Sequence, residues 1–221
     1  MANANVITTV LFDYGGVLAE EGFIQGLAAI AKENGLDPPP FFHTATETIY
    51  DCSYVTGKCT EQAYWQLLRA LTGIRGEDRE LTEAILSRFI LRPKMLAAVR
   101  ALQGQGLKPV ILSDQTDWLD RLNTRQPFFQ EFSRVFNSYH LGKTKREPSL
   151  FLDVLAALNI EPGHALFVDD NPGHIERAAA LGLHTHLFHN EPLFFAELAR
   201  LGFTHIPPED MTRGGDRYAG S

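Results

Sequence analysis

The chain has little cysteine, no long apolar run and no excess of basic residues. Its two cysteines, Cys52 and Cys59, are not spaced as a C-x-x-C pair, and so few in 221 residues indicate a reducing compartment. No apolar run approaches the roughly 18 residues of a membrane-spanning helix. No basic segment precedes the first apolar stretch, as it would in a signal peptide. We therefore expect a cytoplasmic protein without a membrane partner.

The charge balance argues against a nucleic-acid partner. Lysine and arginine number 20 against 27 aspartates and glutamates, a formal net charge of -7. The densest basic cluster, Lys143 with Lys145 and Arg146, is too short to neutralise a phosphate backbone. The 44% hydrophobic and 21% charged content is that of an ordinary globular protein. The length suits one α/β domain with a modest insertion, and the oligomeric state is left open.

An apolar run that ends in a carboxylate organises the chain. Residues 6–12 are apolar and β-branched with little polar alternation, which predicts a strand buried on both faces. Asp13 follows, and Gly15 and Gly16 let the backbone turn sharply and approach a ligand. Taken alone, such an aspartate is more often a turn or capping residue. Because ligands bind beyond the carboxyl ends of strands in open α/β sheets, we interpret Asp13 as part of a site.

Helical patterns dominate residues 18–91. Helices are expected at residues 23–30, 45–52, 60–73 and 80–89, with Thr60 as an N-cap. Gly35 and the three prolines at 38–40 are expected to end the first of them. No strand is evident here, so we predict a small helical insertion at residues 19–91, between two parts of an α/β core at residues 1–18 and 92–206.

Strands and helices alternate in the second half of the chain. Strands are expected at residues 108–113, 134–140, 165–170 and 183–188, and helices at 93–102, 117–122, 148–158, from Asn171–Pro172 to Gly182, and at 191–201. This alternation predicts a Rossmann-like parallel sheet with right-handed crossovers. Residues 207–221 are expected to be a loosely ordered tail.

Polar groups follow three of the predicted strands. Asp13, Ser113 and the pair Asp169–Asp170 come at strand ends, and Lys145 lies in a loop between the second and third. Clustered carboxylates repel one another unless a cation intervenes, and an all-oxygen ligand set favours Mg²⁺. A hydroxyl and a lysine suit phosphoryl oxygens. These are the parts of phosphoryl transfer through an aspartyl-phosphate.

In this order, the residues resemble the four motifs of the haloacid dehalogenase-like (HAD) hydrolase superfamily. The matching segments are Phe12-Asp13-Tyr14-Gly15-Gly16-Val17, Leu112-Ser113, Lys145 and Val168-Asp169-Asp170. Each motif alone is weak, but the four in sequence are specific and cover essentially the whole chain outside the tail. The helical insertion resembles the small cap that one subgroup carries after the first motif.

The resemblance implies a Mg²⁺ site. Asp13 would be both nucleophile and metal ligand, and the backbone carbonyl of Gly15 would be a second ligand. Asp170, with Asp169 beside it, would complete the ligand set.

The resemblance also implies a phosphate site. Ser113 and Lys145 would hold the transferring phosphoryl group, and backbone N–H groups at Tyr14, Gly15 and Gly16 would cradle it. The Tyr14 side chain is also a candidate for substrate contact, although an aromatic residue beside a core strand is more often packing.

Gly15 is the first departure from the family pattern. Phosphatases of the family usually carry a second aspartate at this position as general acid and base, a role that typically contributes about 10²–10⁴-fold. We expect weakened or rerouted acid/base catalysis here. Glu20, Glu21 and Asp114 are the candidates for supplying the proton.

Two further departures concern the phosphate site. Asp114 stands where related sequences often have asparagine, as a candidate substrate-binding residue. A carboxylate there is unfavourable unless it faces the metal or is paired, and its alternative role is to cap the following helix. Arg146 replaces the proline that usually follows the lysine, which would either loosen the loop or add a phosphate contact.

Together these features predict a Mg²⁺-dependent phosphatase acting on a small phosphorylated metabolite. The alternative is a phosphate-binding or regulatory protein that lost turnover with the acid at Gly15. A metal-free 2-haloacid dehalogenase, also found in this superfamily, is disfavoured by the Asp169–Asp170 pair.

Overall fold

Five parallel strands form one sheet in the order β3-β2-β1-β4-β5. The structure is a computed structural model that describes residues 6–204, so the tail expected at 207–221 lies outside the described residues. The strands are β1 (Thr9–Phe12), β2 (Lys108–Ser113), β3 (Arg134–Asn137), β4 (Ala165–Asp169) and β5 (His184–Leu187). This confirms the predicted Rossmann-like parallel core.

The strand register brings the carboxyl ends of three strands to one edge. Phe12 of β1 is level with Ile111 of β2 and with Val168 of β4. The chain order reverses between β1 and β4, and such a switch point is where ligands bind in open parallel sheets. The residues just beyond these strand ends therefore face a common crevice.

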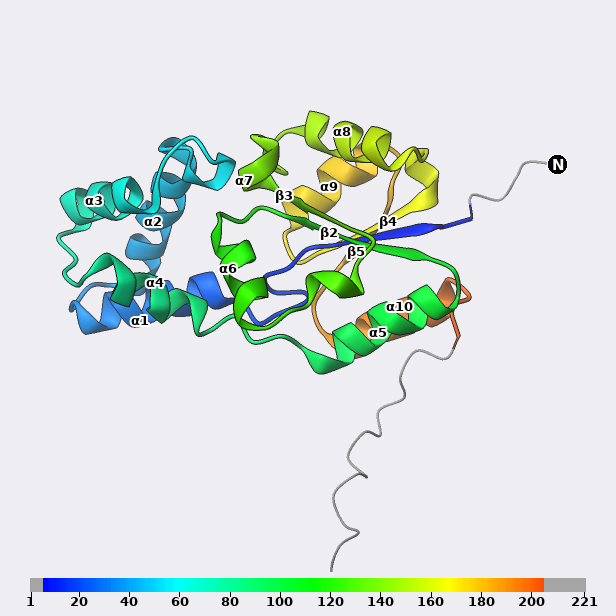
Figure 1. Cartoon of the computed structure of the whole chain (residues 1–221), viewed down its shortest axis with the longest axis horizontal. Coiled ribbons are helices and arrows are strands. Elements are labelled where there is room, and N and C mark those ends of the chain that lie inside the picture. Colours follow the sequence, from blue (N-terminus) through cyan, green and yellow to red (C-terminus); the bar gives the residue numbers. More distant parts are fainter. Residues whose placement is uncertain (1–5, 205–221) are drawn as a thin grey trace, which may run out of the picture.

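Helices cover both faces of the sheet (Figure 1). They are α5 (Pro93–Gly104), α6 (Trp118–Arg125), α7 (Ser138–Leu141), α8 (Pro148–Leu158), α9 (Pro172–Ala180) and α10 (Glu191–Arg200). Helices α5 and α10 lie on one face, where the Phe12 ring packs edge-on against Phe194 at 5.8 Å between centroids. Helices α8 and α9 lie on the other, where Phe151 packs against Phe167 at 5.2 Å.

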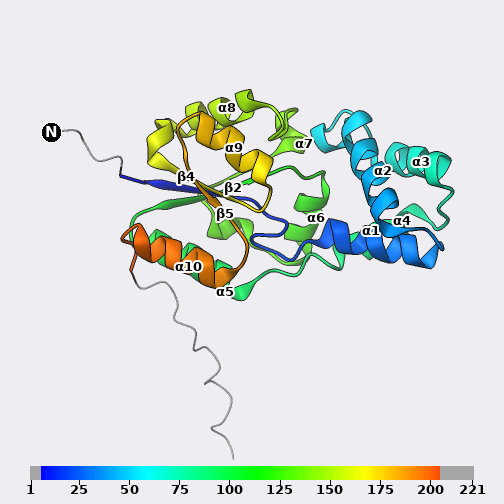
Figure 2. The same ribbon diagram turned by 180° about the vertical axis from the view of Figure 1, so that it is seen from behind.

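The remaining four helices lie together beyond the carboxyl ends of the strands (Figures 1 and 2). They are α1 (Gly22–Glu33), α2 (Pro38–Asp51), α3 (Glu61–Thr72) and α4 (Asp78–Leu86). Their interior holds Tyr64 and Trp65, both fully buried, and Trp118 of α6 stacks on Trp65 at 6.3 Å. Aromatic packing therefore joins these helices to the rest of the fold.

Two chain segments connect α1–α4 to the sheet, and they pair with each other. Ala19 forms an antiparallel bridge with Leu91. Beside it, the N–H of Glu20 donates to the carbonyl of Ile90 at 2.8 Å, and the N–H of Arg92 donates to the carbonyl of Leu18 at 2.9 Å. The outgoing and returning connections thus form one short hydrogen-bonded ribbon.

Local signals predicted most helix starts correctly. The Thr60 hydroxyl accepts from the N–H of Ala63 at 3.2 Å, and the Asn171 side chain caps α9 through the N–H of Gly173 at 2.9 Å. No helix within residues 6–204 combines the length and the apolar character that crossing a membrane requires.

Helix α1 ends before Gly35 as expected, but several other boundaries are wrong. The first strand begins at Thr9 and not at residue 6. The helix expected from residue 45 begins at Pro38, because the first N–H groups of a helix have no intrahelical acceptor and proline therefore loses no hydrogen bond there. The strand expected over 134–140 ends at Asn137, whose side chain accepts from the N–H of Tyr139 at 3.3 Å and starts α7.

Candidate active site

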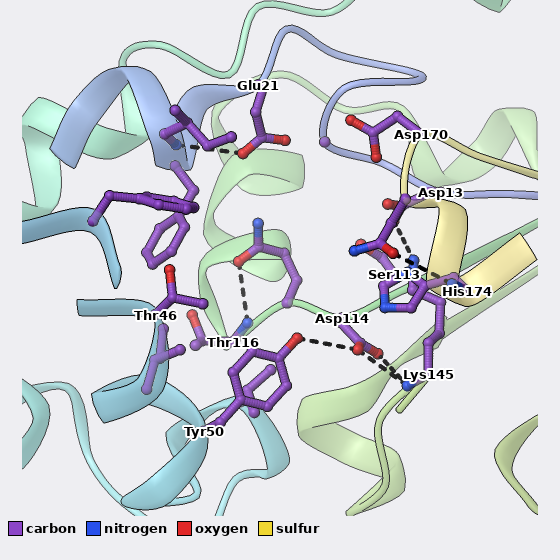
Figure 3. Close-up of a pocket in the computed structure, with 18 of the residues that line it drawn as sticks. Asp13, Glu21, Thr46, Tyr50, Ser113, Asp114, Thr116, Lys145, Asp170 and His174 are labelled. Carbon is purple, nitrogen blue, oxygen red and sulfur yellow. Dashed lines mark hydrogen bonds and ion pairs between the residues drawn. The ribbon is translucent and has the colours of Figure 1, made fainter. Parts of the chain in front are cut away.

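A cavity of about 370 Å³ opens between the carboxyl ends of the strands and helices α1 and α2 (Figure 3). Seven of the residues singled out from the sequence line it: Asp13, Gly15, Glu21, Ser113, Asp114, Lys145 and Asp170. They come from the ends of β1, β2 and β4, from the loop before α8 and from the start of α1. The parallel sheet therefore brings together groups that are up to 157 positions apart in the chain.

Lys145 is the buried cation at the centre of this site. Its ammonium Nζ lies 2.9 Å from Oδ1 of Asp13 and 2.6 Å from Oδ2 of Asp169. Burial opposes the charged form, but the carboxylates of Asp13, Asp169 and Asp114 outweigh it and raise the pKa of Lys145. Lys145 is therefore a fixed positive charge that is 0% exposed.

The pKa values of the two carboxylates that share Lys145 are shifted in opposite directions. Burial raises the pKa of Asp13 well above its usual value, and the neighbouring carboxylates Asp169 and Asp170 add to the rise against the effect of Lys145. Burial also acts on Asp169, but Lys145 and His174 outweigh it and hold the pKa of Asp169 at about 2. Asp169 is thus the anion that pairs with Lys145, and an added cation would oppose the rise in the pKa of Asp13.

The donor set fits a hard divalent cation. Asp13, Asp169 and Asp170 each offer a carboxylate oxygen, and these oxygens lie within 4.8 Å of one another. Such a group of oxygen ligands suits Mg²⁺. Gly16, with a φ of 75°, makes room for it, because a Cβ there would meet Oδ2 of Asp170 at 2.0 Å. Only glycine leaves this carboxylate in place.

Asp114 fixes the loop that carries Lys145. Both of its carboxylate oxygens accept from the backbone N–H of Lys145, at 2.9 and 3.0 Å, and Oδ2 also accepts from the hydroxyl of Tyr50 on α2 at 3.3 Å. Asp114 is therefore paired with neighbouring donors, which is one of the two conditions under which a carboxylate was expected at this position. The helix-capping alternative is wrong, since the N-cap of α6 is Asp117.

Arg146 contacts α2 instead of lining the cavity. Its guanidinium lies over the ring of Tyr50, 3.5 Å from the centroid, and pairs with Glu47 at 3.3 Å. The residue that replaces the usual proline thus links the Lys145 loop to α2.

The carboxylate of Glu21 occupies the space that a side chain at position 15 would fill if residue 15 were not glycine. Glu21 is the N-cap of α1 and accepts from the N–H of Ile24 at 3.4 Å. A Cβ built on Gly15 would lie 2.9 Å from Oε2 of Glu21. Glu20, by contrast, pairs with Arg92 at 3.3 Å. Of these two neighbouring carboxylates, Glu21 is the one that lines the cavity.

The environment of Glu21 favours its protonated form. Burial, with the charge of Asp170 adding to it, raises the pKa of Glu21 to about 7. At neutral pH this carboxyl group exchanges readily between acid and base, which is the condition for proton transfer.

The sequence profile of the haloacid dehalogenase-like hydrolases matches residues 7–182. The chain belongs to this hydrolase family. The matched range contains every motif residue from Asp13 to Asp170 and the four helices α1–α4.

Two curated proteins are similar in sequence to this chain. Mouse bifunctional epoxide hydrolase 2 is 28% identical over 149 residues, 60% of this chain and 26% of the relative, so the chain spans about a quarter of that protein. The phosphoserine phosphatase of Thermus thermophilus is 28% identical over 197 residues, 80% of this chain and 78% of the relative.

The fold is shared with solved HAD structures. A HAD family enzyme from Bacteroides thetaiotaomicron superposes with a TM-score of 0.69 at 21% identity, covering 86% of this chain and 98% of that one. At this identity the likeness establishes the fold.

Two expected binding residues of this HAD hydrolase do not line the cavity. The Tyr14 ring is 1% exposed and stacks on Phe128 at 5.1 Å, so it belongs to the core. Its backbone N–H donates to Oδ1 of Asp13 at 2.7 Å. Gly16 does not line the cavity, but its lack of a side chain leaves room for the carboxylate of Asp170. For both residues a phosphate contact through the backbone N–H stays a prediction.

His174 and Thr46 are among the cavity residues that were not singled out from the sequence. The Nδ1 of His174 lies 3.2 Å from both oxygens of Asp169. The predicted cap at Asn171 already set His174 in the first turn of α9, beside the end of β4, and was the signal that could have found it. Thr46 carried no comparable signal.

Proposed function

We propose that this HAD hydrolase is a Mg²⁺-dependent phosphatase that acts on a small phosphorylated metabolite through an aspartyl-phosphate on Asp13. The observation that carries the proposal is the position of Asp13 in one cavity between the buried Lys145 cation and the free carboxylate of Asp170. A nucleophile, a fixed cation and an oxygen-rich metal site are the parts that phosphoryl transfer requires.

The side chains take the following roles in this proposal. Asp13 attacks phosphorus, and Ser113 and Lys145 hold the phosphoryl oxygens. Asp169 keeps Lys145 in position. Asp13, Asp170 and the carbonyl of Gly15 hold Mg²⁺, which when bound offsets the charge that builds up on the phosphoryl group.

Glu21 takes over the proton transfer in the proposed mechanism. Its carboxylate fills the space beside Gly15, where the usual acid is missing. Glu20 is paired with Arg92, and Asp114 already accepts from the N–H of Lys145. Protonated Glu21 donates to the leaving alkoxide, and the carboxylate then takes a proton from the water that attacks the aspartyl-phosphate.

We further propose a division into two structural parts. Residues 19–91 act as a cap that forms the leaving-group side of the cavity, and residues 1–18 with 92–206 act as the catalytic core. The pairing of the two connecting segments at Ala19 and Leu91 supports this boundary.

The comparisons support the same chemistry. The Thermus thermophilus relative is a phosphoserine phosphatase. The Bacteroides thetaiotaomicron HAD enzyme has been solved in complex with magnesium and inorganic phosphate.

Hydrolysis of p-nitrophenyl phosphate with and without Mg²⁺ tests the proposal, beside an Asp13→Asn variant. We expect Mg²⁺-dependent release of phosphate that the variant abolishes. Activity that survives Asp13→Asn, or that needs no divalent cation, contradicts it.

The second candidate is a phosphate-binding or regulatory protein with little turnover, favoured by the glycine at position 15. It predicts Mg²⁺-dependent binding of fluoroberyllate by the parent with no hydrolysis of any phosphomonoester. A Gly15→Asp variant that acquires turnover would support this candidate.

A further inference from the structure

The wall of the cavity opposite Asp13 is apolar. Helices α1 and α2, with the turn after α2, supply most of it, through Phe23, Ile24, Phe42, Ile49, Tyr50 and Val55. In Figure 3, Thr46 and Tyr50 of α2 lie across the cavity from Asp13 and Asp170. Apolar walls of this kind bind the carbon skeleton of a ligand, and a few polar groups set its orientation.

Charge on the cavity wall is almost entirely negative. Among the cavity-lining residues in the described chain, Lys145 is the sole lysine or arginine, and Asp13 and Asp169 already hold its ammonium. Asp114 adds a carboxylate on the leaving-group side, and Glu21 adds a carboxyl group that becomes a second one when it loses its proton. A carboxylate or second phosphate on the leaving group would meet these groups with no further lysine or arginine among the cavity-lining residues between positions 6 and 204 to pair with it, which disfavours binding.

One buried polar atom on the apolar wall has no partner. Thr46 lines the cavity, but its hydroxyl oxygen is buried against the wall and no hydrogen bond satisfies it. Its neighbours on α2 are satisfied: the Thr44 hydroxyl donates to the carbonyl of Pro40 at 3.1 Å, and that of Thr48 donates to the carbonyl of Thr44 at 2.7 Å. Buried hydroxyls are normally paired, so a turn of the Thr46 side chain about χ1 toward the cavity would give this hydroxyl a partner on a ligand.

Resting on the proposed phosphatase function, we propose that the substrate is a phosphomonoester of an uncharged, ring-containing alcohol that carries one hydroxyl-type group bonded to Thr46 Oγ1. The apolar wall selects the ring, the carboxylates reject acidic leaving groups, and the unpaired Thr46 hydroxyl selects the additional polar group. Leaving groups such as serine and glycolate, which bear a carboxylate, are excluded.

Hydrolysis of matched esters tests the selection by charge. The probes are 2-phenylethyl phosphate and its three ring-hydroxylated isomers, against O-phosphoserine and 2-phosphoglycolate, all with primary alkyl leaving groups. We expect kcat/KM for the best ring ester to exceed that for both acidic esters by at least about 10-fold. This is the low end of the discrimination that a single methylene gives in an apolar pocket, and a ring buries more apolar surface than one methylene. Equal or faster hydrolysis of an acidic ester overturns the inference and leaves the phosphatase function standing.

The variant Thr46→Val tests the hydrogen bond at constant shape. In the parent, one hydroxylated isomer should exceed 2-phenylethyl phosphate by about 2- to 10-fold, the effect of a single net hydrogen bond. Thr46→Val should erase that preference, so that the hydroxylated isomers and 2-phenylethyl phosphate are hydrolysed with the same kcat/KM. The control Thr44→Val, on the same helix but outside the cavity, should keep the preference. If no isomer exceeds the plain ester, the role of Thr46 is overturned.

Binding separates the inference from the proposed function. 3-Phenylpropylphosphonate and 2-amino-4-phosphonobutyrate are non-hydrolysable analogues of a ring ester and of phosphoserine. Calorimetric titration in Mg²⁺ should favour the first. If the first analogue binds more tightly but no ester is hydrolysed, the phosphatase function is overturned and the inferred leaving-group site is supported. If neither analogue binds and no ester is hydrolysed, the phosphatase function and the leaving-group site are both overturned.

Discussion

Both carboxylate oxygens of Asp114 accept the backbone N–H of Lys145, at 2.9 and 3.0 Å. The carboxylate belongs to the segment after β2, and the N–H belongs to the loop before α8, so one hydrogen-bonded contact sets the distance between two of the motifs. Burial raises the pKa of Asp114, with Lys145 working against the rise. The contact is therefore made inside the protein, where a lost hydrogen bond is costly.

Removing this contact should release the Lys145 loop. We expect Asp114→Ala to lower the free energy of unfolding by about 1–3 kcal/mol, because a buried N–H is left unpaired, and to reduce turnover as Lys145 loses its fixed position. Asp114→Asn should retain most of both, since the amide oxygen still accepts. Urea unfolding and ester hydrolysis measure the two effects. Equal losses in both variants would show that the charge of Asp114 matters more than the hydrogen bond.

Lys145→Met should be among the most damaging substitutions in the chain. It leaves the carboxylates of Asp13 and Asp169 buried without their cation, and breaking a buried pair in this way costs about 3–5 kcal/mol. The matched control is Lys143→Met, whose ammonium pairs with Asp153 at the surface and should cost less than about 1 kcal/mol. Chemical unfolding without metal compares the two, and similar losses would contradict the central role of Lys145.

Gly16→Ala should destroy the metal site. A Cβ at this position meets Oδ2 of Asp170 at 2.0 Å and must displace it. Gly35→Ala is the control, because its φ of +67 is similar and no atom lies within 4 Å. Both variants bear the strain of a left-handed alanine, about 1–2 kcal/mol. We expect calorimetric titration to show loss of Mg²⁺ binding for Gly16→Ala alone, and retained binding in both would argue against Asp170 as a ligand.

The raised pKa of Glu21 should make the stability of the metal-free protein depend on pH. Its pKa is about 7 in the folded protein, against 4.5 for the free side chain. The folded state holds the proton more tightly, so this group's contribution is complete below about pH 4.5 and is lost as the pH rises through 7.

Glu21→Gln should abolish this contribution. Relative to the parent, the variant should gain up to about 3 kcal/mol in the free energy of unfolding between pH 4.5 and 8. The control Glu20→Gln removes a surface ion pair with Arg92, and its difference from the parent should stay within about 1 kcal/mol. Urea unfolding across this pH range gives both differences. A flat difference for Glu21→Gln would show that Glu21 is solvated and unsuited to proton transfer.

Features set by neighbouring residues could be predicted from the sequence. The caps at Thr60 and Asn171 follow from a side-chain oxygen and an N–H two or three residues apart. The meeting of Asp13, Ser113 and Asp170 at one edge follows from a general property of parallel strands, whose carboxyl ends coincide.

Features set by tertiary contacts could not be predicted. The sequence offers no way to rank Glu21 above Glu20, because the choice depends on how the segment after Gly16 folds back beside Gly15. The same holds for Asp114 and Tyr50, 64 residues apart, which meet only once α2 packs across the cavity. The unpaired hydroxyl of Thr46 is likewise a property of the packed helix.

In the proposed division into cap and core, the hydrogen-bonded ribbon at Ala19 and Leu91 would be the hinge of the four helices. Paired segments resist sliding past each other but bend across their width, so α1–α4 would swing as a lid about this ribbon. Glu21 stands directly after the ribbon, at the first turn of α1, and moves with the lid. Opening would therefore admit bulk water to Asp13 and withdraw the carboxyl group of Glu21 in the same motion. Under the proposed mechanism, the protein would protonate a leaving group only while the cavity is shut.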